Sequence, residues 1–151
     1  MARQMRTVAV VLGFAVLAGC DNPFPPGAIV RGTFGGNNAG LMADDTSAHL
    51  HIRCTYGDIH QAIELDMNSR FDVPGEQNIT AHPVDLGILH PARFTGSIDG
   101  RTMTLTVTLT DTAVTLGPVV LTFNKEPNMG DACPICFGKS ARARMVRLTL
   151  H

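Results

Sequence analysis

Apolar and polar residues alternate with a period of two along most of the chain, which predicts an all-β protein. The alternation is clearest in residues 92–111, ARFTGSIDGRTMTLTVTLTD, whose second half has a threonine at every second position. Because successive side chains of a strand point to opposite faces, this strand has one apolar face and one polar face. We expect Met103, Leu105, Val107 and Leu109 to point inward and Thr102, Thr104, Thr106, Thr108 and Thr110 to point outward.

Turn residues divide this region into separate strands. Asp99-Gly100 predicts a two-residue hairpin turn, because both residues tolerate the positive φ angles that such turns need. This turn would pair Gly96 with Met103. A third strand is predicted at 114–123, and its apolar phase slips at Gly117-Pro118, where we predict a β-bulge.

A second hairpin is predicted in residues 48–67, on the two sides of Tyr56-Gly57. A two-residue turn at these positions places Cys54 opposite Ile59. The apolar residues of both strands then share one face, so Cys54 is expected on the inward face of its strand.

The remaining alternation predicts strands at 29–34, 41–44, 70–73 (extendable to Thr80) and 145–150. Eight or nine short antiparallel strands are typical of a small up-and-down β-barrel, with a β-sandwich as the alternative. We favour the barrel, because closure removes exposed strand edges. Residues 28–151 are expected to form this single β domain. Its inward aliphatic set comprises Leu50, Ile52, Ile63, Leu65, Leu105, Val107 and Leu121.

Residues 1–19 have the pattern of a secretory signal peptide, which we expect to be helical. Arg3 and Arg6 give a positive start, and residues 7–19 carry no charge. This stretch is shorter than the ~20 apolar residues of a membrane-spanning helix. Asp21 and three prolines follow it, so no longer span is available.

The end of this stretch, Leu17-Ala18-Gly19-Cys20, resembles the lipobox of bacterial lipoproteins. The resemblance implies cleavage before Cys20, a diacylglycerol on its thiol, and an acyl chain such as palmitate on its amino group. Residues 20–27 would then be the lipidated cysteine and a proline-rich tether at a membrane of the bacterial cell envelope. In a Gram-negative bacterium, Asp21 favours the periplasmic face of the inner membrane, with the outer membrane as the alternative.

Composition narrows the classes of partner. The mature chain keeps all 13 acidic residues and loses two of the 12 basic ones, so it is mildly acidic and we expect no nucleic-acid partner. Tryptophan is absent and Tyr56 is the one tyrosine, which leaves few platforms for stacking bases or sugars. Arg31-Gly32-Thr33-Phe34 resembles, over these few residues only, the Gly-x-Trp motif of lipocalins, with Phe34 in place of tryptophan.

Besides Cys20, the mature chain has Cys54, Cys133 and Cys136, and the exported compartment favours disulfides. We expect a bridge from Cys54 to Cys133, with Cys136 as the alternative partner, that ties the 124–142 loop to the barrel. Closing about 80 residues is worth on the order of 4 kcal/mol in the chain-entropy treatment. A local Cys133–Cys136 bridge and a redox or metal role of this Cys-Pro-Ile-Cys motif stay open as alternatives.

Three histidines, His49, His51 and His60, are expected on the outward face of the 48–67 hairpin, with Glu64 opposite His49. His-x-His on a strand points both rings the same way, a spacing that zinc and copper sites use. An exposed polar sheet face has the same pattern. The three histidines are therefore weak metal candidates, and we expect no cofactor.

No catalytic motif accompanies these features: Gly-x-Ser-x-Gly, HExxH and phosphate-binding glycine loops are absent from the sequence. We therefore expect a non-enzymatic binding module of the cell envelope. Its partner would be a small apolar ligand held in the barrel or another envelope protein. The alternatives are a structural or inhibitor-type interaction protein, and a redox or metal-binding protein that uses Cys133 and Cys136.

Overall fold

The computed structural model describes residues 22–80 and 87–130, and it contains eight strands and no helix within them. The expected all-β class is confirmed. The predicted signal helix (1–19) and the predicted strand at 145–150 lie outside the described residues. The strands are β1 (Gly32–Gly36), β2 (Ala39–Ala43), β3 (Ala48–Ile52), β4 (Thr55–Ile59), β5 (Arg70–Asn78), β6 (His90–Asp99), β7 (Thr102–Leu109) and β8 (Thr115–Phe123).

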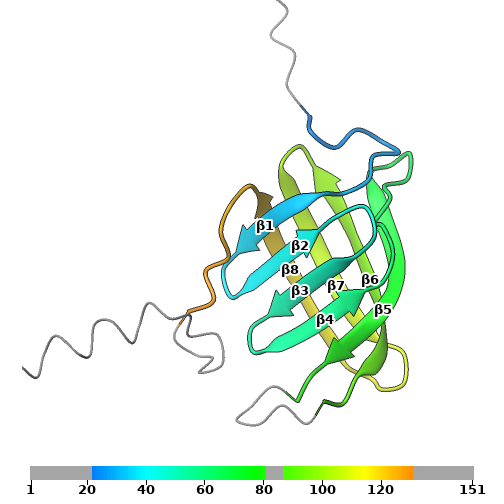
Figure 1. The fold of residues 1–151 in the computed structure, drawn as a ribbon, viewed down its shortest axis with the longest axis vertical. Coiled ribbons are helices and arrows are strands. Elements are labelled where there is room, and N and C mark those ends of the chain that lie inside the picture. Colours follow the sequence, from blue (N-terminus) through cyan, green and yellow to red (C-terminus); the bar gives the residue numbers. More distant parts are fainter. Residues whose placement is uncertain (1–21, 81–86, 131–151) are drawn as a thin grey trace, which may run out of the picture.

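The eight strands form a closed, up-and-down antiparallel barrel, as the sequence predicted, rather than a sandwich. Each strand pairs with the next one, and β8 returns to pair with β1 through Phe34 and Phe123. In Figure 1, β1–β4 lie in front of β7 and β8 and cross them at a steep angle, and β5 curves around the right side. β8 pairs with β1 only near the end of β8, and β2 and β3 also lie close to β8.

Side chains fill the interior of the barrel. The predicted inward aliphatic set is confirmed, since none of its seven members is more than 5% exposed. Phe94 is completely buried, and its ring lies against Gly57 and Gly75, where a Cβ atom would collide with it. The Phe71 ring lies in the same way against Gly96. Strand glycines therefore make room for the large rings of this core.

The β6–β7 hairpin has the predicted faces, but its turn is one residue later than predicted. Asp99 pairs with Thr102, so Gly100-Arg101 is the turn, and Gly96 pairs with Leu105 rather than Met103. Gly100 has a φ of 56°, which suits the first central position of a type II′ turn. The shift moves the partner by two residues, so the inward and outward sets stay unchanged.

The predicted turn of the first hairpin is wrong by three residues. Ile52 pairs with Thr55, so the turn is Arg53-Cys54, and Tyr56-Gly57 lies inside β4. Cys54 therefore sits in a turn and not on an inward strand face opposite Ile59. The physical reason is in the core, because Gly57 is the position where the Phe94 ring and the Gln77 side chain need space.

The predicted β-bulge in β8 is confirmed. Leu105 pairs with Val119 and Val107 pairs with Leu116, so Gly117-Pro118 stand opposite one residue of β7. Gly117 has a φ of 99°, in the region that favours glycine. The bulge restores the inward phase of the second half of the strand, where Leu121 is fully buried.

One end of the barrel, which we call the closed end, is sealed by the segment that precedes β1. Val30 donates a hydrogen bond to the Ile63 carbonyl at 2.8 Å, and Leu65 donates to the Ala28 carbonyl at 3.0 Å. Phe24 is buried there and contacts the rings of Phe34 and Phe123 at centroid distances of 5.4 and 4.8 Å. Packing onto the barrel thus begins at Phe24, inside the segment expected to be only a tether.

After β8 the chain turns back and runs over the outside of β1. Asn128 donates a hydrogen bond to the Gly36 carbonyl at 3.0 Å, and Asn38 donates to the Asn128 carbonyl at 2.6 Å. The segment passes so close to Gly35 and Gly40 that a Cβ atom on either glycine would collide with it. The described part of the expected 124–142 loop, up to residue 130, is therefore packed against the barrel.

Candidate functional site

The outer face of β3 and β4 carries a cluster that we call the histidine surface, made of His49, His51, Tyr56 and Asp58. The strand register places His49 opposite Asp58 and His51 opposite Tyr56. Leu50 and Ile52 alternate with the histidines and are buried, so both imidazoles must point outward. The predicted outward position of His49 and His51 is confirmed.

The two imidazoles and the carboxylate form a short chain of polar contacts. His49 Nδ1 lies 2.6 Å from Asp58 Oδ1. His49 Nε2 lies 2.9 Å from His51 Nε2. The carboxylate can only accept a hydrogen bond, so the Nδ1 atom of His49 carries a proton, and the Nε2 atom of the neutral ring has a free lone pair. Asp58 therefore aims that lone pair at His51.

Burial lowers the pKa of His51 below its ordinary value, and the neighbouring His49 lowers it further. The negative charge of Asp58 and a hydrogen bond with the backbone of Thr55 oppose this shift without cancelling it. The Tyr56 ring lies beside both imidazoles, with centroid distances of 6.1 Å to His49 and 6.2 Å to His51. Neutral His51 is thus the favoured form over a wider pH range than for an exposed histidine.

The structure separates the third predicted histidine from this cluster. His60 follows the end of β4 and contacts Glu76 at 3.5 Å. The residue opposite His49 is Asp58 and not Glu64, which was the predicted neighbour, because the turn lies three residues earlier than predicted. Within residues 22–80 and 87–130, no group of three or more His, Cys, Asp or Glu side chains is arranged to hold a metal ion.

Sequence reasoning missed Asp58 and Tyr56 as members of the histidine surface. The predicted turn contains Tyr56 and pairs Asp58 with Thr55, away from both histidines. The available signal was the alternation itself. Tyr56, Asp58 and His60 occupy every second position after Thr55, so they lie on the same face of one strand. A turn at Arg53-Cys54 would have placed Tyr56 opposite His51 and Asp58 opposite His49.

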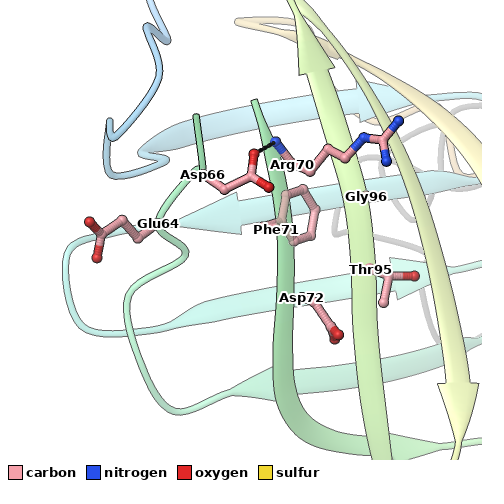
Figure 2. Close-up of a pocket in the computed structure, with 7 residues that line it drawn as sticks. All are labelled: Glu64, Asp66, Arg70, Phe71, Asp72, Thr95 and Gly96. Atoms are coloured by element: carbon pink, nitrogen blue, oxygen red, sulfur yellow. Dashed lines mark hydrogen bonds between the residues drawn. The ribbon is translucent and has the colours of Figure 1, made fainter. Parts of the chain in front are cut away.

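A concave region, of about 450 Å³, lies beside the unpaired part of β5 and is lined largely by charged residues (Figure 2). Asp66 Oδ1 accepts hydrogen bonds from the backbone N–H groups of Asn68 and Arg70, at 2.7 and 2.8 Å. Figure 2 shows the Arg70 guanidinium pointing away from Glu64. The Asp66 carboxylate thus holds the turn before β5. The lining residues are Glu64, Asp66, Arg70, Phe71, Asp72, Thr95 and Gly96.

Another concave region, of about 380 Å³, opens at the end of the barrel away from Phe24. We call this end the far end. The concave region lies between the β3–β4 turn and the β8 bulge, and Ile52, Leu116 and Val119 give it an apolar wall. We call it the mouth groove. Cys54, in the adjoining turn, is partly buried. Cys20, Cys133 and Cys136, the other predicted lipid and disulfide positions, lie outside the described residues.

No protein-family profile, curated protein or solved structure matches the chain. Along the part of the chain that the structure describes, we find no helix whose length and apolar character would let it cross a membrane. The function is therefore argued from the barrel and its surface features.

Proposed function

We propose that the protein is a lipid-anchored, non-enzymatic binding module of the bacterial cell envelope, and that it binds another envelope protein through the outside of its barrel. The observation that carries this proposal is the filled interior. The side chains of Phe34, Phe94, Leu41 and Met103 are completely buried. The rings of Phe94 and Phe71 pack directly against strand glycines. Small barrels either fill with side chains or hold a ligand, and this packing favours contacts at the surface.

The outer face of β6–β8 is the part of the surface best suited to a protein partner. The strand register aligns Ser97 with Thr104 and Val120, and it aligns Thr95 with Thr106. These five residues, which we call the threonine face, carry no charge, and Val120 is 60% exposed. Interface cores are depleted of charged side chains, because charges are costly to remove from water. The outer faces of β3–β5 carry histidines and carboxylates instead.

Photo-crosslinking in native membranes tests the proposed surface. A photoreactive residue at Thr104 or Val120 should give an adduct of one defined mass, because both side chains point outward from the threonine face. The same residue at Gln61, which is exposed after β4, is the matched control. Equal adducts from all three positions, or none from the threonine face, would contradict a specific partner at this surface.

The proposed localisation in the cell envelope depends on cleavage before Cys20 and acylation of this residue. Asp21 favours the periplasmic face of the inner membrane. Phe24 packs on the closed end, so the described barrel begins four residues after Cys20. Two or more acyl chains would hold the barrel stably at a bilayer. Intact-mass measurement of protein extracted from native membranes should give residues 20–151 plus lipid. An unmodified Cys20 would overturn the anchor.

The mouth groove supports a second candidate, a small apolar ligand. Its volume lies within the ~300–1,000 Å³ that ligand pockets occupy. Organic extraction of protein purified from native membranes should then release one compound in stoichiometric amount. Leu116→Asp should abolish its retention, while Val120→Asp, on the outer face, should not. If the purified protein releases no compound, the small-ligand candidate is excluded and the protein partner stays the proposed ligand.

The placement of Cys54 supports the proposed bridge to Cys133, with Cys136 as the alternative. Gly130 lies against the Asn38 side chain, and the Asn38 carbonyl accepts a hydrogen bond from the backbone N–H of Arg53 at 2.6 Å. Residue 130 is thus held beside the turn that contains Cys54. Peptide mapping without reduction should find this bridge. Two reactive, low-pKa thiols in the Cys133-Pro134-Ile135-Cys136 motif would instead support a redox or metal role.

A further inference from the structure

We propose that His49 and His51 form a binding site for a single copper(II) ion on the outer face of the barrel. This function is separate from the proposed partner binding, because the histidine surface lies on β3 and β4 and the threonine face on β6–β8. The site is built from the convergence of two Nε2 atoms and from the residues that hold the two rings.

The two Nε2 atoms face each other at hydrogen-bond distance. Asp58 occupies the Nδ1 side of His49, and His51 has a hydrogen bond with the backbone of Thr55 in addition to its contact with His49. In the metal-free protein a proton between the two nitrogens makes this contact a hydrogen bond, and a metal cation could take the place of that proton. Imidazole nitrogen is a preferred ligand of copper and zinc.

The Nε2–Nε2 distance favours copper(II) geometry. Two nitrogens each about 2.0–2.1 Å from one ion lie about 2.9 Å apart when the angle at the ion is a right angle, and about 3.3 Å apart when it is tetrahedral. Tetragonal copper(II) uses right angles between neighbouring ligands, whereas zinc prefers the tetrahedral arrangement. The separation of 2.9 Å therefore matches the spacing of neighbouring copper(II) ligands, and the two rings would turn to aim both lone pairs at one ion.

The surroundings supply the other features of a metal site. Asp58 fixes the tautomer and orientation of His49, as the carboxylate partners of metal-bound histidines do. Met42 lies opposite His49 on β2, on the same outer face, and is 58% exposed, so its thioether can approach the ion. The His49 side chain is 39% exposed, which leaves room for water to complete the coordination.

Copper titration of the full chain, purified from membranes in detergent and freed of metal, tests the site. Tyr56 is the one tyrosine of a sequence without tryptophan, and its ring lies beside both imidazoles. One equivalent of copper(II) sulfate should therefore quench the tyrosine fluorescence. Electron paramagnetic resonance should give a tetragonal copper(II) spectrum with coupling to nitrogen.

Substitutions show whether copper binds at His49 and His51 or at other histidines of the chain. His51→Gln should weaken binding at least about tenfold and remove part of the nitrogen coupling, and Asp58→Asn should weaken binding about 10- to 100-fold. His90→Gln and His60→Gln are matched controls, because these histidines pair with Asp111 and Glu76 away from the site. Both control variants should bind copper as the unchanged chain does.

Three outcomes would overturn the proposal. They are the absence of quenching at micromolar copper, unchanged affinity in both His49→Gln and His51→Gln, and a spectrum without nitrogen coupling. Circular dichroism establishes that each variant is folded. Because His51→Gln and Asp58→Asn act on different strands of the outer face, one of them still tests the site if another variant unfolds. Failure of copper binding would leave the crosslinking result at the threonine face unaffected.

Discussion

At the scale of single residues, two adjacent buried amides on β5 differ in how well they are bonded. Gln77 and Asn78 are both completely buried. Among the described residues, the Gln77 Oε1 atom has no hydrogen-bond partner, although its Nε2 donates to Thr55 Oγ1 at 3.0 Å. Asn78 Nδ2 donates to Tyr56 Oη at 3.1 Å, and its Oδ1 accepts from the backbone N–H of Thr80 at 2.8 Å. An unsatisfied buried carbonyl costs free energy, so the two amides should differ in their effect on stability.

We predict that Gln77→Met leaves the free energy of unfolding unchanged or raises it by about 1 kcal/mol, since it removes the unsatisfied carbonyl at similar volume. Asn78→Leu, the matched control, should lower it by about 1–3 kcal/mol, because it leaves the Thr80 N–H without its acceptor. Urea unfolding followed by circular dichroism measures both. A Gln77→Met variant as unstable as Asn78→Leu would contradict the argument.

The ionisation of Asp44 should make the free energy of unfolding depend on pH. The backbone N–H of Thr46, then the Thr46 hydroxyl and the backbone N–H of Ser47, hold the pKa of this carboxyl below its usual value of 3.8. The ionised form is therefore favoured in the folded state. Its contribution to stability is complete above the unfolded pKa and is lost as the pH falls through the folded pKa.

Asp44→Asn keeps the shape and one acceptor of the turn but removes the charge. We predict that this variant is less stable than the parent chain at neutral pH, and that the difference shrinks as the pH falls below about 4. Urea midpoints between pH 7 and pH 2 follow the difference. A constant difference across this range would show that the charge of Asp44 does not contribute.

At the scale of elements, the sequence predicted the faces of the strands better than their partners. Met103 and Leu105 are fully buried as predicted, because a period of two depends only on which side of the sheet is solvated. Both hairpin turns were misplaced, since glycine and aspartate are common in turns but also serve other purposes. Gly57 lies in a strand to make space for Phe94, a contact between β4 and β6 that no local pattern reveals.

The turn that replaced the predicted one contains an arginine in an unfavourable conformation. Arg53 has a φ of 53°, which costs an L residue about 1–2 kcal/mol and costs glycine nothing. We predict that Arg53→Gly raises the free energy of unfolding by about 1 kcal/mol. Arg101→Gly, in the turn of the β6–β7 hairpin but without a positive φ, should lower it by at least about 0.5–1 kcal/mol. This variant also loses the hydrogen bond of the Arg101 guanidinium to the Phe123 carbonyl and its contact with the Phe123 ring.

Thermal or urea unfolding of the two variants distinguishes the observed hairpin from the predicted one. With a turn at Tyr56-Gly57, Arg53 would lie inside a strand, and glycine there would destabilise the protein. A loss of stability in Arg53→Gly would therefore contradict the observed turn. Both variants lose one positive charge, so a gain of stability in Arg53→Gly cannot come from a general benefit of glycine in a turn if Arg101→Gly is less stable.

At the scale of the whole molecule, closure into a barrel was predicted from the strand number, but the sealing of its ends was not. Phe24 follows a proline and precedes two more, which indicated a tether, yet its ring packs with Phe34 and Phe123. The histidine surface was predicted in part, because His49 and His51 share a strand, whereas Asp58 joined them only through the register of β4. Contacts between distant segments account for both differences.

The position of Phe24 also sets the orientation of the barrel at the proposed membrane anchor. Four residue steps separate Phe24 from Cys20, which is at most about 14 Å of extended chain. The closed end must then lie near the bilayer, and the far end, with the mouth groove and the β1–β2 turn, must point away. A lipid-anchored barrel with a longer tether would have no such preference.

We predict that a fluorophore at Met67, which is 81% exposed in the turn next to the closed end, is quenched by lipids that carry a quencher in the headgroup region. A fluorophore at Asn37, in the exposed β1–β2 turn of the far end, should be quenched much less. Insertion of a long Gly/Ser segment between Pro23 and Phe24 is the control. It should make the two positions equal, because a flexible linker lets the barrel rotate freely above the bilayer. Equal quenching at Met67 and Asn37 in the unmodified chain would contradict an anchor that acts through the closed end.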